Sequence, residues 1–432
     1  MSHPDVAFRN QIQWKRGVPA LERWLLRQIF EAIGPAPLRF AFKDGTSFSP
    51  PGVTPVATIL IRDLHTLVGM MFDPEVYFGE AYAEGRVEVQ GDLARALQVV
   101  YESWPNGRAH RSVYPRLTSQ WADWRQKNSL HGSRSNIHCH YDLGNEFYRL
   151  WLDEQMVYTC AYFPSVSATL EQAQEAKLDY ICRKLNLQAG ERVVEAGCGW
   201  GALALHMARK YGVYVKAYNI SHEQIQHARR RAEAERLTER VEFIEDDVRN
   251  ISGQFDVFVS VGMLEHIGVE NYAALGEVMH RCIGDSGRGL LHFIGRSHKG
   301  VFSRWIRKRI FPGAYAPTLA EAMHVLEPNH YAVLDVENLR LHYAKTLEHW
   351  LERFEKSVER VSSMYDPWFP RAWRLYLAGS MAAFRAGTLQ LFQITFAGPQ
   401  SSAIPWTRAG LYHDSRTIAE RVEGTSWTPA TS

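Results

Sequence analysis

A glycine-rich run, Glu195-Ala-Gly-Cys-Gly-Trp-Gly201, has the composition of a ligand-binding loop. It follows the β-branched stretch RVV and precedes a helical pattern, GALALHMARKY. At Gly197 and Gly199 the lack of a Cβ atom lets the backbone turn tightly and approach a ligand closely. The run therefore predicts a site for a nucleotide-like cofactor, held by a loop between a strand and a helix.

Two classes of cofactor fit this loop. Gly197-x-Gly199-x-x-Ala202 is a loose dinucleotide fingerprint, which expects an acidic residue about 20 positions later to hold a ribose. The following strand ends instead in Asn219, which remains able to bond a ribose hydroxyl. The acidic residue, Glu195, precedes the glycines, where it can approach the cationic amino-acid end of S-adenosylmethionine. The pattern favours a methyltransferase over a dehydrogenase.

Other polar positions near the loop have two interpretations each. Ser221-x-x-Gln224 is a capping box for the next helix, so Gln224 has a structural role beside a cofactor-binding one. Asp246 and Asp247 end the third strand, where either carboxylate faces the adenine or only solvent.

Polar and aromatic residues are dense just ahead of the loop, in 136–145 (NIHCHYDLGN) and 156–163 (MVYTCAYF). This density is too high for a mere linker, so we assign both segments to the site. His138, Cys139 and His140 suggest a metal, but adjacent ligands without a partner cluster do not make a zinc site. No metal is predicted.

From about residue 192 short β-branched runs alternate with helical runs. This alternation predicts an α/β fold with a Rossmann-like, doubly wound parallel sheet and helices on both faces. In such sheets ligands bind beyond the carboxyl ends of the strands, where the strand order reverses. Each motif above falls at such an end.

Residues 1–104 predict a small α+β domain that carries no catalytic motif. Lys-Asp-Gly at 43–45 signals a hairpin between LRFAF and TSFSP, and VATILIRD follows as an apolar strand. A helical pattern runs from about 64 to 84, and a last alternating piece, RVEVQGD, precedes an amphipathic helix. We expect this domain to act in packing, lipid docking or dimerisation.

The rest of the chain divides into a basic, aromatic linker at 105–136, a catalytic domain at 137–400 and a C-terminal tail at 401–432. The linker suits either anionic lipid headgroups or a solvated connector. A net charge of +2 over 432 residues does not mark a nucleic-acid binder, and five scattered cysteines predict reduced thiols. With no signal-peptide or membrane-spanning stretch in the sequence, we expect a cytoplasmic protein with at most peripheral membrane contact.

Several separated motifs make the chain resemble the cyclopropane fatty acid synthases, S-adenosylmethionine-dependent enzymes that methylenate cis double bonds in phospholipid acyl chains. The resemblance runs from Asn136 to about Gly398, and the N-terminal domain also looks like the one in bacterial members. The motifs are HYDLGN, YTCAYF, EAGCGWG, SVGMLEHIG, LHFIG, IFPG, YAKTL and FRAGTLQLFQITF. GCGWG alone would indicate only a methyltransferase.

The resemblance implies a mechanism and its residues. The alkene attacks the sulfonium methyl group, a carbocation forms on the acyl chain, and bound bicarbonate removes a proton as the ring closes. The residues that match the bicarbonate ligands are Glu265, His292 and Tyr343, with backbone contacts at Cys160 and Ile294. Glu265 would accept the bicarbonate O–H while the histidine and tyrosine donate. The alternative makes Glu265 an acid at a helix N-terminus and His292 a core histidine.

Glu265 follows the fourth predicted strand and His292 lies within the fifth, so both can converge on one anion at the carboxyl edge of the sheet. For the cofactor, the resemblance implies contacts from Tyr158, Thr159, Glu195, Gly197, Gly199, Gln224 and Asp247, and further from Asn219 and Val248. Val248 stands where relatives often place an aromatic residue, so some stacking on the adenine is lost. Ser380 stands where some relatives have cysteine, which argues against a required thiol there.

The segment from Lys299 to Phe311 interleaves bulky apolar residues with five cations. It predicts either a basic, amphipathic face for an anionic membrane, at about 1 kcal/mol per cation, or a solvated helix over the mouth of the active site. The aromatic residues, 20 Phe, 19 Tyr and 13 Trp, suit an acyl tunnel as well as ordinary core packing.

We therefore predict transfer of a methylene from S-adenosylmethionine to a cis double bond of an unsaturated phospholipid, which forms a cyclopropane. The alternatives are a methyltransferase that gives a methylene or methyl-branched chain, one that acts on a furan or polyene, and a non-catalytic lipid-binding homologue. The resemblance also suggests a homodimer. We expect the protein at the inner face of the cell membrane.

Overall fold

The computed structural model describes residues 20–34, 36–50, 52–103, 143–300 and 303–412. The predicted linker at 105–136 and the residues His138, Cys139 and His140 lie outside the described residues. So do residues 413–432 of the predicted tail.

The N-terminal part forms a four-stranded sheet in the order β2-β1-β3-β4. Its strands are β1 (Leu38–Phe42), β2 (Ser47–Phe48), β3 (Ala57–Ile61) and β4 (Val87–Gly91). β1 is parallel to β3, while β2 and β4 are antiparallel to their neighbours, as the predicted hairpin requires for β1 and β2. The accompanying helices are α2 (Ala20–Ile33), α3 (Leu64–Phe72), α4 (Pro74–Ala83) and α5 (Leu93–Ser103).

The helical pattern predicted from about 64 to 84 forms two helices, α3 and α4, with a break at Asp73. Asp73 ends α3 and caps α4, because its side chain accepts from the backbone N–H of Val76. Pro74, which lacks an N–H, then occupies the first turn of α4, a position that proline favours.

The larger sheet has seven strands in the order β10-β11-β9-β8-β5-β6-β7. They are β5 (Arg192–Ala196), β6 (Tyr214–Asn219), β7 (Val241–Glu245), β8 (Val257–Val261), β9 (Arg288–Gly295), β10 (Ala332–Asn338) and β11 (Gln390–Ala397). β5 to β9 are mutually parallel, whereas β11 is antiparallel to β9 and β10 is antiparallel to β11. The strand order reverses at β5, so the ligand crevice is expected at the carboxyl end of that strand.

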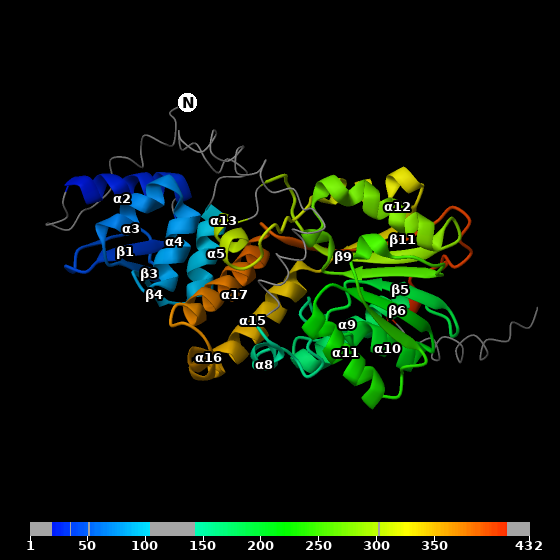
Figure 1. Ribbon diagram of the computed structural model, residues 1–432. Helices are drawn as coiled ribbons and strands as arrows, with labels where there is room; N and C mark the ends of the chain where they lie inside the picture. The colour runs from blue at the N-terminus through cyan, green and yellow to red at the C-terminus, as the bar shows by residue number, and fades with distance from the viewer. Residues whose placement is uncertain (1–19, 35, 51, 104–142, 301–302, 413–432) are drawn as a thin grey trace, which may run out of the picture.

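Helices cover both faces of this sheet (Figure 1). On one face lie α9 (Leu170–Lys184), α10 (Ala202–Tyr211) and α11 (His222–Ala234), which share an apolar core with β5, β6 and β8. On the other face α12 (Tyr272–Ile283) packs against β8, β9 and β11. The predicted α/β fold with a doubly wound sheet is therefore confirmed.

A helical layer lies between the two sheets (Figure 1). It contains α15 (Arg340–Lys356), α16 (Val358–Met364) and α17 (Phe369–Ala386), which connect β10 to β11. α17 packs on α4 and α5 on one side and on α15 on the other, and one hydrophobic core runs through all four. Trp151, Trp350 and Trp373 are fully buried there, so large rings fill the space next to the main sheet.

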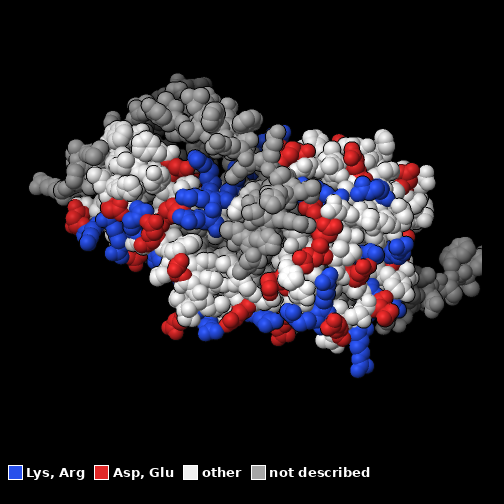
Figure 2. All heavy atoms as spheres, in the orientation of Figure 1, with Lys and Arg blue, Asp and Glu red and all other residues white. Residues whose placement is uncertain are grey.

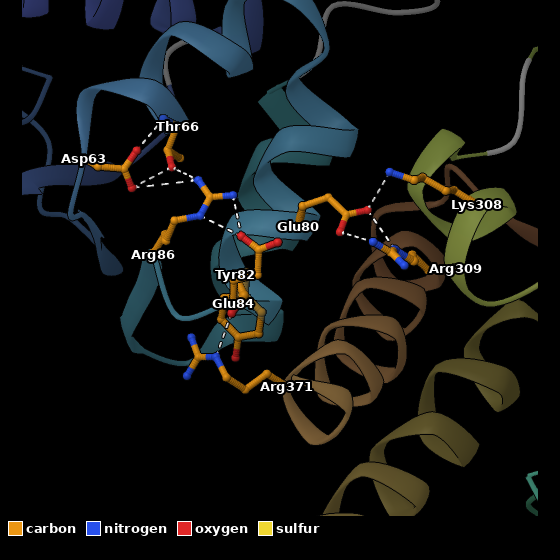
Figure 3. A network of polar contacts seen from close by, with 9 residues as sticks. All are labelled: Asp63, Thr66, Glu80, Tyr82, Glu84, Arg86, Lys308, Arg309 and Arg371. Atoms are coloured by element: carbon orange, nitrogen blue, oxygen red, sulfur yellow. Dashed lines mark hydrogen bonds and ion pairs between the residues drawn. The ribbon is translucent and has the colours of Figure 1, made fainter. Parts of the chain in front are cut away.

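Polar contacts also join the N-terminal part to the rest (Figure 3). Arg371 of α17 donates to the Tyr82 carbonyl oxygen at 2.6 Å, and its guanidinium lies 4.6 Å from the centre of the Tyr82 ring. From the short helix α13 (Arg304–Arg309), Arg309 donates to both oxygens of Glu80 at 2.9 and 2.7 Å, and Lys308 lies 3.0 Å from the same carboxylate. The contacts of Lys308 and Arg309 with Glu80 fix α13 against α4, and the Arg371 contact joins α17 to α4.

Candidate active site

The glycine-rich loop turns at the carboxyl end of β5, as predicted. Gly199 and Gly201 both have positive φ, of 53° and 84°. A Cβ at Gly201 would lie 2.7 Å from the Phe243 ring, whereas a Cβ at Gly199 would meet nothing within 4 Å. Gly201 therefore allows α10 to pack against β7, and Gly199 leaves open space beside the loop for a ligand.

Glu195 supplies a carboxylate next to this loop. It is 2% exposed, and its Oε2 has no hydrogen-bond partner among the residues that the structure describes. Burial raises the pKa of this carboxyl to about 8, although the nearby ammonium of Lys177 acts in the opposite direction. A buried acceptor without a protein partner fits the ammonium group of an amino-acid ligand.

The side chains after β6 and β7 are already paired within the protein. Asn219 Nδ2 donates to Gln224 Oε1 at 2.6 Å. The predicted capping box is therefore wrong in part: Ser221 does accept from the Gln224 backbone N–H, but the Gln224 side chain turns to Asn219. Asp247 is bonded through both carboxylate oxygens to Arg249, which competes with its predicted contact to the adenine.

One cavity of about 70 Å³ lies beside the carboxyl ends of β8 and β9. It brings together residues from four separate segments that the sequence assigned to the site: Tyr158, Thr159, Cys160, Glu265, His292, Ile294 and Tyr343. The remaining walls are mostly apolar or aromatic and include Phe311, Leu347, Tyr376, Phe384, Leu389 and Leu391. Val248, which was predicted to lie near the adenine, is buried but does not line this cavity.

Glu265 is held in the cavity wall by a backbone contact. It lies in the short 3-10 helix Leu264–His266 that follows β8, and the N–H of Ile294 donates to its Oε1 at 2.5 Å. Within the described part of the chain, Oε2 has no hydrogen-bond partner. Burial raises the pKa of Glu265 to about 7, so the group can change charge near neutral pH. The Ile294 N–H, predicted to contact an anion, is engaged by Glu265 here.

His292 faces the same cavity from within β9, in register with Val261 of β8, so the predicted adjacency to the end of β8 is confirmed. Its Nδ1 lies 3.0 Å from Gln393 Nε2, and its Nε2 has no hydrogen-bond partner in the ranges that the structure describes. Burial lowers the pKa of this imidazole well below its ordinary value of 6.5, and the charges of Lys177 and Lys184 add to the effect. The ring is therefore neutral at physiological pH.

The loop that carries Tyr158, Thr159 and Cys160 is fixed by buried polar side chains that the sequence analysis did not identify. Gln174 Nε2 donates to the Thr159 carbonyl oxygen at 2.9 Å, and Lys177 Nζ donates to Thr159 Oγ1 at 3.2 Å. Burial lowers the pKa of Lys177 to about 8. Gln174 and Lys177 lie three residues apart on the buried face of α9, and polar residues on such a face were the missed signal.

Four more wall residues carry polar side-chain atoms and were not assigned to the site: Tyr315, Tyr376, His266 and Ser380. Tyr376 of α17 has its hydroxyl 2.8 Å from that of Tyr158. His266 also lines the cavity, and burial lowers its pKa to about 4. Ser380, noted in the sequence as a replacement for cysteine, faces the cavity as well.

The thiol of Cys160 donates to the Ala161 carbonyl oxygen at 3.2 Å. Burial raises the pKa of this thiol, so it stays protonated.

The basic segment proposed for membrane contact is paired within the protein. Arg304 contacts Asp73 at 2.7 Å, and Lys308 and Arg309 contact Glu80. Figure 2 shows blue side chains gathered where Figure 1 places α13, with red ones beside them. This pairing reduces the positive charge that the segment offers to an anionic surface. A membrane-crossing helix would need more length and more apolar residues than any helix in the described ranges has.

Comparisons with known proteins agree with this architecture. The model of the mycolic acid cyclopropane synthetase family matches residues 128–394. A probable fatty acid methyltransferase of Pseudomonas putida is 36% identical over 392 residues, which cover 87% of this chain and 96% of that protein. The cyclopropane-fatty-acyl-phospholipid synthase of Escherichia coli strain K12 is 40% identical over 259 residues, or 60% of this chain and 66% of that protein.

Solved structures give the same result for the fold. The mycolic acid cyclopropane synthase CmaA1, crystallised with SAH and CTAB, is 31% identical and superposes with a TM-score of 0.59 over 61% of this chain and 97% of that one. The cyclopropane synthase MmaA2 of Mycobacterium tuberculosis is 28% identical, with a TM-score of 0.59 over 61% and 98% of the two chains. The family model covers more than half of the sequence, and the chain thus belongs to the mycolic acid cyclopropane synthetase family of S-adenosylmethionine-dependent methyltransferases.

Proposed function

We propose that this enzyme transfers a methylene group from S-adenosylmethionine to a cis double bond in a phospholipid acyl chain and closes a cyclopropane ring, with bicarbonate as the base. The observation that carries the proposal is the cavity lined by Glu265, His292 and Tyr343 together with the loop at 158–160. The E. coli relative is named for this reaction on fatty-acyl phospholipids.

The polar atoms of the cavity fit a small anion that has its own O–H group. When bound, S-adenosylmethionine supplies a methyl group on a sulfonium, and bicarbonate supplies a base of low nucleophilicity. Glu265 Oε2 would accept the hydrogen bond of the anion's O–H, while His292 Nε2–H and the Tyr343 hydroxyl would donate to its oxygens. Both Glu265 Oε2 and His292 Nε2 are buried atoms without partners among the described residues, so a ligand with this donor and acceptor pattern satisfies them.

The apolar walls protect a carbocation on the substrate. Glu265, His292 and Tyr343 form the polar cluster of the cavity. Around it lie the rings of Tyr158, Tyr376 and Phe384, and aromatic faces attract positive charge. Exclusion of water from such a wall prevents capture of the cation by a hydroxyl group. Glu195 and the backbone of Gly197 and Gly199 would hold the methionine end of the cofactor, and Gln224, Asn219, Asp247 and Val248 would lie near its nucleoside end.

One alternative reaction shares every step up to the carbocation but does not close the ring. If a hydride shifts before the proton is lost, the product is a methylene or methyl-branched chain, and the P. putida relative is named only as a probable fatty acid methyltransferase. In addition, the resemblance suggests a homodimer, and a phospholipid substrate implies peripheral contact with the inner face of the cell membrane. Both stay proposals.

The test is incubation of the full-length protein with cis-monounsaturated phospholipid vesicles, S-adenosylmethionine and bicarbonate, followed by proton NMR and mass analysis of the released fatty esters. Upfield ring protons with loss of vinyl signals support the proposal. Retained or shifted vinyl signals at the mass of one added CH₂ replace the ring by a branched product. Unchanged mass with every cis-monounsaturated lipid overturns the proposal.

A further inference from the structure

We propose that Gln393 is a positioning residue for this reaction, because its side chain fixes the tautomer of His292 that directs Nε2–H into the cavity. The inference rests on the proposed function, in which His292 donates a hydrogen bond to the anion. Gln393 does not line the cavity and acts only through the imidazole.

The sheet itself places the two side chains together. β9 and β11 are antiparallel, and Gln393 is the register partner of His292, so both side chains project on the same face. The distance from Gln393 Nε2 to His292 Nδ1 is 3.0 Å. Gln393 is 0% exposed and His292 is 2% exposed, so water does not compete for this contact.

The contact determines which ring nitrogen carries the proton. An amide nitrogen only donates, so Nδ1 must accept and the single proton of the neutral ring must reside on Nε2. Nε2 is the ring nitrogen without a protein partner in the described ranges, and the imidazole lines the cavity. The hydrogen-bond donor is thereby presented to a ligand rather than to the protein.

A purely structural role does not account for a glutamine at this position. Its neighbours Leu391, Ile394 and Phe396 on β11 are buried apolar residues, and an apolar side chain would fill the same space without burying an amide. Gln393 Oε1 has no hydrogen-bond partner among the described residues, which adds a cost to folding. A residue that costs stability in a strand core and contacts a cavity histidine fits a role in positioning.

The test combines ¹⁵N NMR of histidine-labelled full-length protein with bicarbonate-dependent turnover. Gln393→Met keeps the volume but removes the hydrogen bond, and Gln393→Glu keeps the volume but accepts from Nδ1–H. Gln390→Met, on the same strand and outside the cavity, is the matched control. The His292 signals are assigned by their loss in His292→Asn.

In the wild type and in Gln390→Met we expect the pattern of an Nε2-protonated neutral ring. In Gln393→Glu we expect protonation at Nδ1, and in Gln393→Met we expect about a tenfold rise in the bicarbonate concentration for half-maximal turnover, as the loss of one hydrogen bond implies. Cofactor affinity should not change in either variant.

Nδ1 protonation in the wild type overturns the assignment, and so does an unchanged His292 tautomer in Gln393→Glu. The tautomer of Gln393→Glu can be measured even if Gln393→Met does not fold. Unaltered bicarbonate dependence in folded Gln393→Met overturns it too. If the tautomers change as expected but the wild type makes no lipid product, the proposed function fails and the effect of Gln393 on His292 stands.

Discussion

Replacement of Glu265 by glutamine alters one polar group in the cavity wall and keeps its shape. The new amide would retain an oxygen to accept the Ile294 N–H, which lies 2.5 Å from Oε1 in the wild type. The second oxygen becomes an NH₂ group, so the O–H of the anion meets a donor in place of an acceptor. Loss of a charge-assisted hydrogen bond costs about 1.5–3 kcal/mol, and a buried unpaired donor costs about 1–3 kcal/mol more. We expect turnover to fall by about 10²- to 10⁴-fold.

The assay measures cyclopropane formation in vesicles at saturating S-adenosylmethionine, and calorimetry measures cofactor affinity separately. Glu277→Gln, the same change on the exposed surface of α12, is the control and should behave as wild type. Since Glu265 lies in the polar cluster rather than in the glycine-rich loop, its replacement should leave cofactor affinity intact. Wild-type turnover in Glu265→Gln, or a loss of activity explained by lost cofactor binding, would refute the role assigned to this carboxylate.

Three further outcomes are expected. Because burial raises the pKa of Glu265 to about 7 and the carboxylate form is the acceptor, turnover at constant bicarbonate should rise with pH through about 7; a rise centred near 4.5 would contradict this. Lys177→Met removes the buried donor to Thr159 Oγ1 and should lower the free energy of unfolding by about 1–3 kcal/mol in urea titrations. Glu80→Gln weakens partly exposed ion pairs to Lys308 and Arg309 and should cost only about 1 kcal/mol or less, so a loss above about 3 kcal/mol would show a larger role for this contact.

The parallel half of the sheet could be predicted because its signals are local. Each strand from β5 to β9 is a short run rich in aliphatic or aromatic residues, and each is followed by a turn or helix that the pattern also marks. Once the strands are parallel and adjacent, the end of β8 and the middle of β9 must meet, which is why Glu265 and His292 could be placed together. The glycine-rich loop followed from the same pattern.

The antiparallel half could not be predicted in this way. β10 and β11 are separated by α15, α16 and α17, and the pairing of β11 with β9 is a long-range choice that no local pattern reveals. Gln393 was therefore read only as part of a family motif, without its partner. The ion pairs of α13 could not be predicted either. An amphipathic basic segment has the same sequence pattern whether it faces a membrane or the carboxylates of α4.

Two buried polar side chains in the cavity wall lower the stability of the fold and leave atoms available to a ligand. Glu265 Oε2 and His292 Nε2 are buried atoms without hydrogen-bond partners among the described residues, and each such atom costs about 1–3 kcal/mol. Burial also makes the charged form of each residue less stable, as their shifted pKa values record. A core selected for stability alone would replace both by apolar side chains. Their position among aromatic walls therefore supports a ligand that supplies both an acceptor and a donor, and bicarbonate meets that requirement without being a strong nucleophile.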